Sequence, residues 1–335
     1  MITPHATWNI LDSTKLQDYM TCPRMYFYRY ILGWRPDYPQ IDLVFGSAWH
    51  KAMAVLLEQG YSNEVLNLAI SAFEEEYRKT FPNAYDDEIY APKMPSNAIR
   101  GLLQYIITYN QDKFEVLAVE VAGTVAISDT QSLHYRIDGI VRDLDGKVYI
   151  LEHKTGSNPG AQWQNQWALK VQIGTYAHVL YCTYPSGEIA GVHVNGFFPH
   201  NPPMLKLNRE MRAGAKDNEF LRMKIWMPPS RMRVWLHTVN HYAERLALDT
   251  EVIKEIPEVL EQAPMLKEFV MNTESCSKYR GCPYRDFCAT WSNPLHHCDT
   301  PPIGFITEFW DPRDSEKEAK TINNIPLEAS SGKVS

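Results

Sequence analysis

Glu152 and Lys154 lie inside an apolar stretch of the sequence, "YILEHKTG" at residues 149–156. The flanking residues predict a buried β-strand, and burying an ionised side chain costs several kcal/mol unless it is paired or binds a metal. The two charges therefore either form a structural ion pair or take part in chemistry.

A second carboxylate, Asp138, is expected to lie beside Glu152. Asp145-Gly146 is a strong signal for a two-residue hairpin turn, and Asp138 and Glu152 are each about six or seven residues from it. A hairpin would place the two carboxylates nearly opposite each other on neighbouring strands. Lys154 would project from the same side of its strand as Glu152, because side chains in a strand alternate with a period of two.

Two neighbouring carboxylates repel unless a cation lies between them, and hard oxygen ligands favour Mg²⁺ or Mn²⁺ over zinc. Such a cation would polarise a phosphodiester and lower the pKa of a bound water, while Lys154 would orient that water and stabilise the developing charge. The alternative is a structural ion pair between Glu152 and Lys154, with Asp138 as a polar residue near the turn. These three residues alone leave both interpretations open.

The elements that would position these residues follow an α/β order. Ser13 or Thr14 can cap the first helix, and Gly60 can end the second. The predicted helices cover 15–32, 45–60, 62–80, about 96–112, 161–182 and about 230–248. The predicted strands cover 114–127, 133–144, the segment ending at 154, and 188–200. Strands in this order, interrupted by a helix, indicate an α/β core.

The composition is that of a globular protein. The chain has 335 residues, of which 44% are hydrophobic, and it contains no run of about 18 apolar residues that would predict a membrane span. Its N-terminus lacks the basic start and apolar stretch of a secretory signal, so an intracellular, cytoplasmic protein is expected. The net charge of -7 gives no general attraction to nucleic acid, which would require a local patch.

A basic segment offers such a patch. Between 204 and 236 there are eight Lys and Arg residues against three acids, and Phe220, Trp226 and Trp235 between them could stack on the bases of a single strand. An ordinary solvated surface is the alternative. The candidate DNA-binding residues are Arg24, Arg209, Arg212, Arg222, Lys224, Trp226, Arg231 and Arg233.

The cysteines are candidate ligands. Cys276, Cys282 and Cys288 are spaced equally by six residues, and Cys22 lies near the other end of the chain. An iron–sulfur cluster needs four thiolates that need not be contiguous. Zinc is less favoured, because no C-x₂₋₄-C pair occurs, and inert core thiols are the other alternative. Cys298 could replace one of the four.

Two motifs resemble known nuclease elements. The segment "RIDGIVRDLDGKVYILEHKTG" resembles the core motif of the PD-(D/E)XK nuclease superfamily, with Asp138 as its first acid and Glu152-His153-Lys154 as its E-X-K element. Ile137 replaces the proline of the motif's name. Downstream, "QIGTYAHVL" resembles the Q-x-x-x-Y element of the RecB-like branch through Gln172 and Tyr176.

The upstream segment "FGSAWHKAM" resembles the G-x-x-x-H element of the same branch, which adds His50. The resemblance implies a PD-(D/E)XK core, with a central mixed sheet flanked by helices, an N-terminal helical region and a C-terminal segment stapled by a cluster. It implies one RecB-like domain over 1–295 and a tail, largely disordered at its end, over 296–335. Its parts would be 1–113 (helical), 114–200 (catalytic core), 201–250 (basic segment and helix) and 270–295 (cysteines).

The resemblance also implies residue roles. The metal would be Mg²⁺ or Mn²⁺. The resemblance extends to the iron–sulfur nucleases, which are the AddB-type helicase-nucleases and the CRISPR-associated RecB-like exonucleases. The implied metal ligands are His50, Asp138, Glu152 and the backbone carbonyl of His153. The implied catalytic residues are Asp138, Glu152, Lys154, Gln172 and Tyr176. The implied [4Fe-4S] ligands are Cys22, Cys276, Cys282 and Cys288.

These roles predict a metal-dependent DNA nuclease that leaves a 5′-phosphate and a 3′-hydroxyl, most readily as an exonuclease on single-stranded ends, with endonuclease cutting also open. Its partners would be DNA and a helicase or other recombination or replication proteins, in repair, phage replication or CRISPR spacer acquisition. The alternative is a non-catalytic iron–sulfur module that binds DNA, or a zinc-stabilised scaffold, with the same fold.

Overall fold

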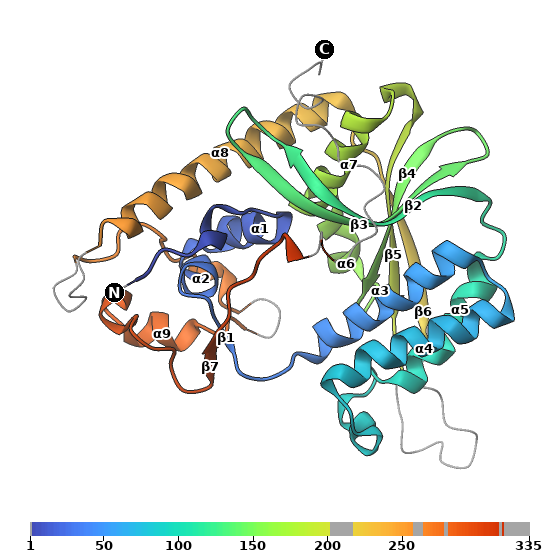
Figure 1. The fold of residues 1–335 in the computed structure, drawn as a ribbon, viewed down its shortest axis with the longest axis horizontal. Helices are drawn as coiled ribbons and strands as arrows, with labels where there is room; N and C mark the ends of the chain where they lie inside the picture. Colours follow the sequence, from blue (N-terminus) through green and yellow to red (C-terminus); the bar gives the residue numbers. More distant parts are fainter. Residues whose placement is uncertain (1, 202–216, 257–263, 278–280, 315–316, 318–335) are drawn as a thin grey trace.

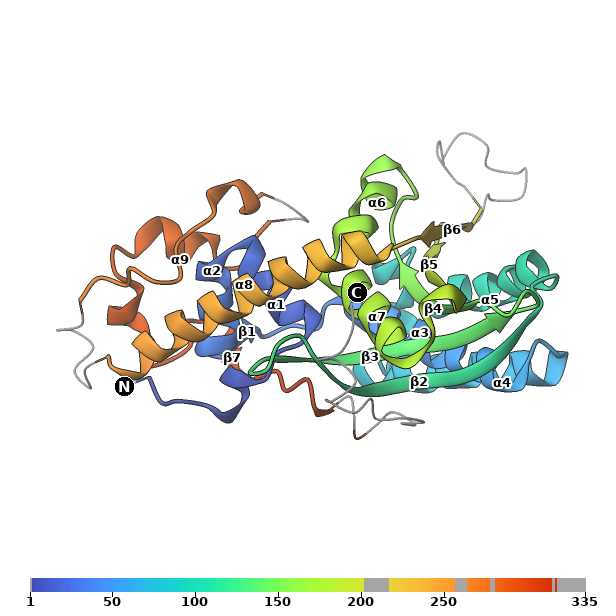
Figure 2. The same ribbon diagram turned by 90° about the horizontal axis from the view of Figure 1, so that it is seen from above.

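A computed structural model of the chain describes residues 2–201, 217–256, 264–277, 281–314 and 317. Figure 1 shows a sheet with helices on both sides and, apart from it, a smaller group of elements built from both ends of the chain. We call this group, residues 2–36 and 264–310, the terminal lobe. The long helix α8 (Pro229–Lys254) runs from the sheet along this lobe in both views (Figures 1 and 2).

The helices lie close to the predicted positions. Gly60 takes a positive φ of 89° and ends α3, as the sequence predicts, and the Ser62 hydroxyl accepts from the Val65 amide to begin α4. The helices before α8 are α1 (Ser13–Thr21), α2 (Pro23–Tyr26), α3 (Ile41–Gln59), α4 (Asn63–Thr80), α5 (Pro95–Tyr109), α6 (Ala161–Gln166) and α7 (Val171–Thr183); α9 (Arg285–Thr290) follows it.

Five strands form a mixed sheet in the order β2-β3-β4-β5-β6, which confirms the predicted central mixed sheet. Neighbouring strands run antiparallel except β4 and β5, which are parallel. A separate pair, β1 with β7, belongs to the terminal lobe. The strands are β1 (Trp34–Pro36), β2 (Phe114–Ala126), β3 (Ser132–Asp143), β4 (Val148–Thr155), β5 (Ile189–Phe198), β6 (Glu219–Ile225) and β7 (Phe305–Thr307).

Both faces of the sheet are covered. Ile150 packs into the core shared with α1, α7 and α8, whereas Leu151 packs beside Leu57 of α3 on the other face. This alternation places Glu152 and Lys154 on the Ile150 side of β4. Helix α7 approaches α8 closely at Gly174, where there is no room for a side chain. A Cβ at this position would lie 2.0 Å from Trp235 Nε1. The α7 side chains are thereby held over one face of the sheet.

The first helix differs from its prediction at both ends. Asp12, and neither Ser13 nor Thr14, is the N-cap of α1, and its carboxylate accepts the Lys15 amide. The helix does not continue to residue 32, because Cys22 is extended at φ -161° and Pro23 begins α2. A π-helical turn over Phe27–Ile31 follows.

Three further corrections concern the region around the sheet. The predicted helix over 161–182 is two helices, because Lys170 is extended between α6 and α7. The turn before β4 is a four-residue connection, closed where the Asp143 amide donates to the Lys147 carbonyl and allowed by the positive φ of Gly146. The basic segment contains an edge strand, β6, that the sequence analysis did not predict.

The segment assigned to the tail begins with regular structure. A 3-10 turn, Pro294–His297, leads to β7, which pairs with β1. The end of the predicted tail, 318–335, lies outside the described residues. Within the described ranges, no helix combines the length and the apolar character that crossing a membrane requires.

Candidate active site

The two predicted carboxylates lie where β3 and β4 separate. The β3–β4 ladder ends at the pair Gly139–Leu151, while β4 continues to pair with β5 as far as Thr155. Asp138 and Glu152 are the next residues outward from that last pair, so the predicted juxtaposition is found. The Asp138 carboxylate accepts the backbone N–H of His153 at 2.7 Å and so replaces a lost ladder bond.

Asp138 is also bonded to the predicted histidine. His50 of α3 lies with its Nδ1 at 2.9 Å from Asp138 Oδ1. Burial alone would raise the pKa of Asp138, but the His50 imidazole beside it holds that pKa well below its ordinary value. Asp138 is therefore ionised, which is the state that a metal ligand requires.

Glu152 is buried with an incomplete set of partners. Its Oε1 lies 2.5 Å from Lys154 Nζ, while its Oε2 is buried without a hydrogen-bond partner. Burial and the neighbouring Asp138 raise the pKa of Glu152 to about 7. A buried acceptor without a donor is costly, and a divalent cation would satisfy it. The residues present thus fit a hard metal ion.

No metal site is complete as these side chains stand. Among the residues that the structure describes, no group of three or more His, Cys, Asp or Glu side chains could hold a metal ion. The contacts explain this, because Asp138 is directed at His50 and His153, and Glu152 at Lys154. Binding a cation requires these oxygens to turn towards it.

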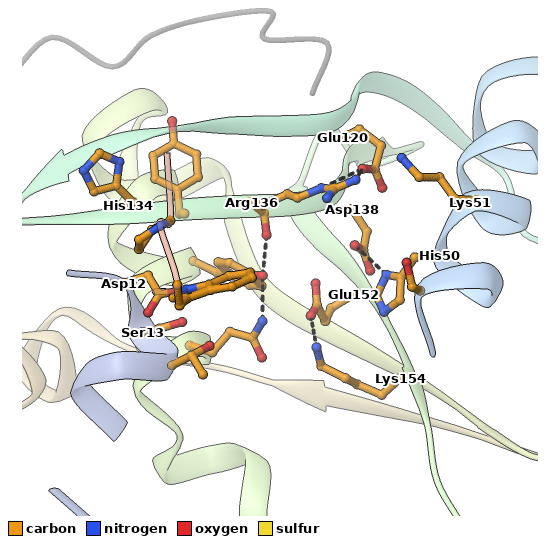
Figure 3. A pocket seen from close by; sticks show the side chains of 17 residues that line it. Asp12, Ser13, His50, Lys51, Glu120, His134, Arg136, Asp138, Glu152 and Lys154 are labelled. Atoms are coloured by element: carbon orange, nitrogen blue, oxygen red, sulfur yellow. Dashed lines mark hydrogen bonds and ion pairs between the residues drawn. The ribbon is translucent and has the colours of Figure 1, made fainter. Parts of the chain in front are cut away.

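A cavity of about 260 Å³ collects the predicted catalytic residues (Figure 3). Gln172 donates to the Tyr176 hydroxyl at 2.8 Å, and that hydroxyl donates to the Arg136 carbonyl, which ties α7 to β3. Four carboxylates and three Lys or Arg side chains line the cavity, so without a cation it would repel a phosphate. The predicted residues that line it are His50, Asp138, Glu152, Lys154, Gln172 and Tyr176.

Residues of this cavity that the sequence did not reveal include Glu120, Arg136 and Trp310. Glu120 lies on β2 opposite Asp138, has a positive φ of 50° and is paired with Arg136 of β3. A lone acid in an apolar strand is the signal that singled out Glu152, and it was present at Glu120 as well. Trp310 also lines the cavity, and nothing in its local sequence places it there.

A family profile described as the PD-(D/E)XK nuclease superfamily matches residues 13–289, which is most of the chain. The chain belongs to this superfamily. No curated protein matches it. A solved structure titled "Crystal structure of SSO0001" is 14% identical, with 78% of this chain and 82% of that chain covered and a TM-score of 0.29. Membership of the PD-(D/E)XK superfamily indicates a metal-dependent nuclease that acts on DNA.

In this PD-(D/E)XK protein, the raised pKa of Glu152 predicts pH-dependent metal binding. A cation needs the ionised carboxylate, so Mn²⁺ affinity is expected to fall at least tenfold per pH unit below about pH 7. Calorimetry in two buffers of different ionisation enthalpy would also show at least one proton released per cation below pH 7, from Glu152, and a second where His50 becomes a neutral ligand. Affinity that is constant from about pH 5 to pH 8 would contradict this prediction.

The raised pKa of Glu152 also determines whether the metal-free protein becomes more or less stable as the pH rises. A carboxyl whose folded-state pKa is raised stabilises the fold fully below its unfolded pKa and loses that contribution as the pH rises through the folded value. For Glu152 this window runs from 4.5 to about 7. The chelated protein should therefore lose stability as the pH rises through this window, and added Mn²⁺ should restore it.

The four predicted cluster cysteines line one pocket of about 350 Å³ in the terminal lobe. Cys22 enters between α1 and α2, and its sulfur accepts the Asn272 backbone N–H at 3.4 Å. Burial raises the pKa of the Cys282 and Cys288 thiols. All six cysteines are free. Within the described ranges the four do not form a group that could hold a metal as they stand.

Cys298 is placed differently from these four. It is buried, does not line the pocket, and its thiol donates to the Pro294 carbonyl at 3.1 Å. Burial raises its pKa to about 12, which disfavours the thiolate that a cluster needs. These contacts favour Cys22 over Cys298 as the fourth thiol beside the C-terminal three.

The predicted DNA-binding residues do not form one surface. Arg24 is buried, with its Nε donating to the Phe269 carbonyl at 2.9 Å, which corrects its prediction as a phosphate contact. Arg222 likewise is tied to Asp112 at 2.6 Å and lies over the Tyr109 ring. These two cations have structural partners that the sequence did not reveal.

The other members of this set have mixed surroundings. Arg231 donates to the Ala168 carbonyl. Lys224, Trp226 and Arg233 are exposed and stay candidates for DNA contact. Arg209 and Arg212 lie outside the described residues.

Proposed function

We propose that this protein is a Mg²⁺- or Mn²⁺-dependent deoxyribonuclease that degrades DNA from single-stranded ends and carries a structural [4Fe-4S] cluster. The observation that carries the nuclease proposal is the meeting of His50, Asp138, Glu152 and Lys154 in one cavity, with Glu152 Oε2 left without a partner. A module that only binds DNA has no use for a buried acceptor that a cation would satisfy.

The roles of the residues follow from their contacts. When bound, Mg²⁺ or Mn²⁺ supplies a Lewis acid for the phosphodiester and lowers the pKa of a water molecule. Asp138 and Glu152 would hold the cation, with His50 and the His153 carbonyl as further ligands. Lys154, whose Nζ lies at Glu152 Oε1, would donate to the attacking water and to the charge that develops on the phosphate.

The other proposed catalytic residues act on the frame of the site. Gln172 and Tyr176 form a chain of hydrogen bonds from α7 to the Arg136 carbonyl, two residues before Asp138. This chain would fix the part of β3 that carries Asp138. Water adds to the phosphorus, and the 3′ oxygen leaves with a proton, which yields a 5′-phosphate and a 3′-hydroxyl.

The cavity supports a single strand as substrate. About 260 Å³ is small even for a pocket that holds one small molecule, so it would admit one phosphate, which a flexible single strand can present most easily. An exonuclease is favoured over an endonuclease because of the resemblance to RecB-like exonucleases. A helicase partner would supply single strands from duplex DNA.

The test is cleavage of end-labelled single- and double-stranded DNA by the purified protein with Mg²⁺, Mn²⁺ or chelator. We expect cleavage of single-stranded ends with either cation, and complete loss in chelator that is reversed by added Mn²⁺. Binding of DNA without cleavage under every condition would instead favour the non-catalytic module. Circular single-stranded DNA separates the two modes, because only an endonuclease cuts it.

A further inference from the structure

The C-terminal part of the terminal lobe reaches the active-site cavity. Strand β7 pairs with β1, the Glu308 amide donates to the Gly33 carbonyl at 2.7 Å, and the Phe309 ring stacks on His5 with centroids 3.9 Å apart. Beyond these contacts, Trp310 lines the cavity together with the catalytic residues. The segment is thus fixed on the terminal lobe immediately before it meets the cavity.

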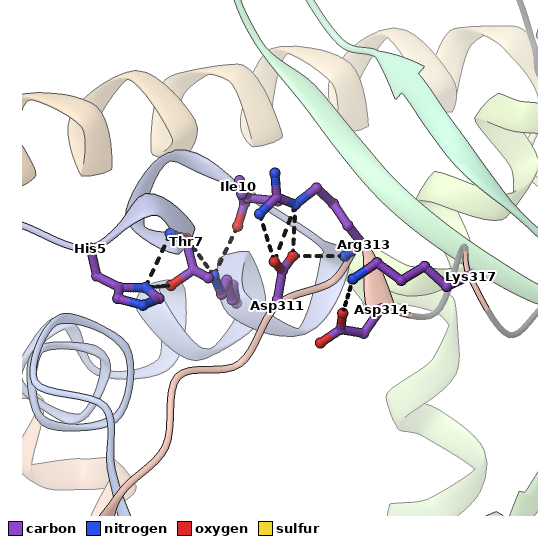
Figure 4. A network of polar contacts seen from close by, with 8 residues as sticks. His5, Thr7, Ile10, Asp311, Arg313, Asp314 and Lys317 are labelled. Atoms are coloured by element: carbon purple, nitrogen blue, oxygen red, sulfur yellow. Dashed lines mark hydrogen bonds and ion pairs between the residues drawn. The ribbon is translucent and has the colours of Figure 1, made fainter.

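The residues after Trp310 are bonded to one another. Arg313 donates from Nε and Nη2 to the Asp311 carboxylate at 2.9 and 2.6 Å, beside Thr7 and Ile10 of the N-terminal segment (Figure 4). These bonds lie within the segment, so Trp310 is held on the fold by the β7 contacts before it and by its own bond to Asp12.

The Trp310 ring has a fixed orientation. Its Nε1 donates to Asp12 Oδ2 at 3.1 Å, while Asp12 Oδ1 accepts the Lys15 amide at 2.7 Å at the start of α1. Asp12 is also bridged to β3, where the His134 amide donates to the Leu11 carbonyl at 2.8 Å. The indole is tied at its edge to a rigid part of the fold.

The indole remains open to solvent despite this anchoring. Trp310 is 48% exposed, whereas Tyr135 and Tyr176, the tyrosines that line the same cavity, are buried at 5% and 3%. Asp12, Ser13 and His134 lie at one end of the cavity, and His50, Asp138, Glu152 and Lys154 at the other (Figure 3). The Asp12 contact places Trp310 at the end away from the carboxylate pair.

We propose that Trp310 is a stacking platform for a nucleobase next to the phosphodiester that the site cleaves, an inference that rests on the proposed nuclease function. An aromatic ring accepts any base, because every base has a π-face. In a duplex both faces of an internal base are already stacked on its neighbours, so a platform in the same cavity as the carboxylates selects for a strand that is single. The negative charge of Asp12 repels a phosphate at this end of the cavity, so an uncharged base is favoured there.

The expected size of this effect follows from base–aromatic stacking. Removal of one such contact lowers affinity by about 5- to 150-fold. Trp310→Leu should reach this range with intact single-stranded oligonucleotides, because leucine keeps the apolar bulk but lacks the ring. Trp310→Phe keeps a ring and loses the hydrogen bond to Asp12, so it should stay close to the parent protein. Equal melting temperatures would show that the segment remains folded.

The stacking role of Trp310 is tested by moving a single abasic site along a labelled oligonucleotide. Binding is measured by anisotropy in chelator, and cleavage is measured with Mn²⁺. The parent protein should show one position at which loss of the base weakens binding, and Trp310→Leu should lose that sensitivity at the same position. Tyr85→Leu is the matched control, because Tyr85 is 96% exposed and does not line the cavity.

The outcomes separate this inference from the proposed function. Cleavage by the parent protein with an unchanged abasic profile in Trp310→Leu overturns the stacking role and leaves the nuclease intact. Higher activity in Trp310→Leu also overturns it, because the ring would then block the cavity. Abasic-sensitive binding through Trp310 with no cleavage of any DNA supports the platform and rejects the nuclease.

Discussion

Replacing Lys154 by alanine is expected to lower the rate of DNA cleavage on the order of 10²- to 10³-fold while DNA binding persists. Lys154 Nζ is the cation beside Glu152 Oε1, and no other ammonium group among the described residues is bonded to that carboxylate. Its loss would remove the proposed donor to the attacking water and to the phosphate charge. Single-turnover cleavage with saturating Mn²⁺ measures this step without product release.

The matched control for this change is Lys147→Ala. Lys147 lies on the same hairpin, in the connection before β4, where its Nζ donates to the Gly187 carbonyl away from the cavity. It should cleave like the parent protein. Asp138→Asn provides a contrast, since it should lose both cleavage and Mn²⁺ affinity, whereas Lys154→Ala should keep the affinity at a pH where Glu152 is ionised. Full activity of Lys154→Ala would rule out the proposed mechanism.

The second large effect is expected at the cysteine pocket. Anaerobically purified protein should be brown and contain about four irons per chain. Serine at any one of the four pocket positions should remove most of the iron, because each thiolate would be one of the four proposed cluster ligands. Iron and sulfide analysis with visible absorbance measures this outcome. The four positions are Cys22, Cys276, Cys282 and Cys288.

Two cysteines of the same chain serve as matched controls. Cys182→Ser and Cys298→Ser should retain iron, because neither side chain lines the pocket. A colourless preparation with stoichiometric zinc would reject the iron–sulfur proposal in favour of a zinc-stabilised scaffold. Retention of iron in Cys22→Ser together with its loss in Cys298→Ser would exchange the roles of those two thiols.

Loss of the cluster should also destabilise the fold. Cys22 and Cys276 are far apart in the sequence, and a cross-link that closes so long a loop contributes roughly 2–5 kcal/mol. Urea unfolding of Cys282→Ser should show a loss of this order in the free energy of unfolding, and Cys298→Ser a smaller one. An unchanged free energy in Cys282→Ser would show that the pocket does not staple the lobe.

The pairing of Asp138 with Glu152 could be predicted because its signal is local. One hairpin joins Asp138 to Glu152, so counting outward from the turn brought them together even though the turn itself has four residues. His50 and Tyr176 needed the motif resemblance, since nothing local relates α3 or α7 to β3. The family profile confirms that resemblance at the level of the superfamily.

Residues that depend on distant contacts could not be predicted. The sequence predicted Arg24 as a phosphate contact. In the structure it donates to the carbonyl of Phe269, which lies at the other end of the chain and could not be paired with it in advance. Trp310 reaches the cavity because two three-residue strands pair, and β1 and β7 are too short to give a periodic signal. Arg222 is paired with Asp112, which lies 110 residues earlier in the chain, so this contact could not be predicted from the sequence either.

The terminal lobe has a consequence for how the protein is made. Tyr28 is fully buried against Tyr284, and Tyr284 also donates to the Trp34 carbonyl. A ribosome adding about 5–20 residues per second needs roughly 10 to 50 s to travel between these partners. Throughout that interval the aromatic side chains near the N-terminus of the nascent chain lack the partners that bury them. Such exposed apolar surface is what chaperones bind.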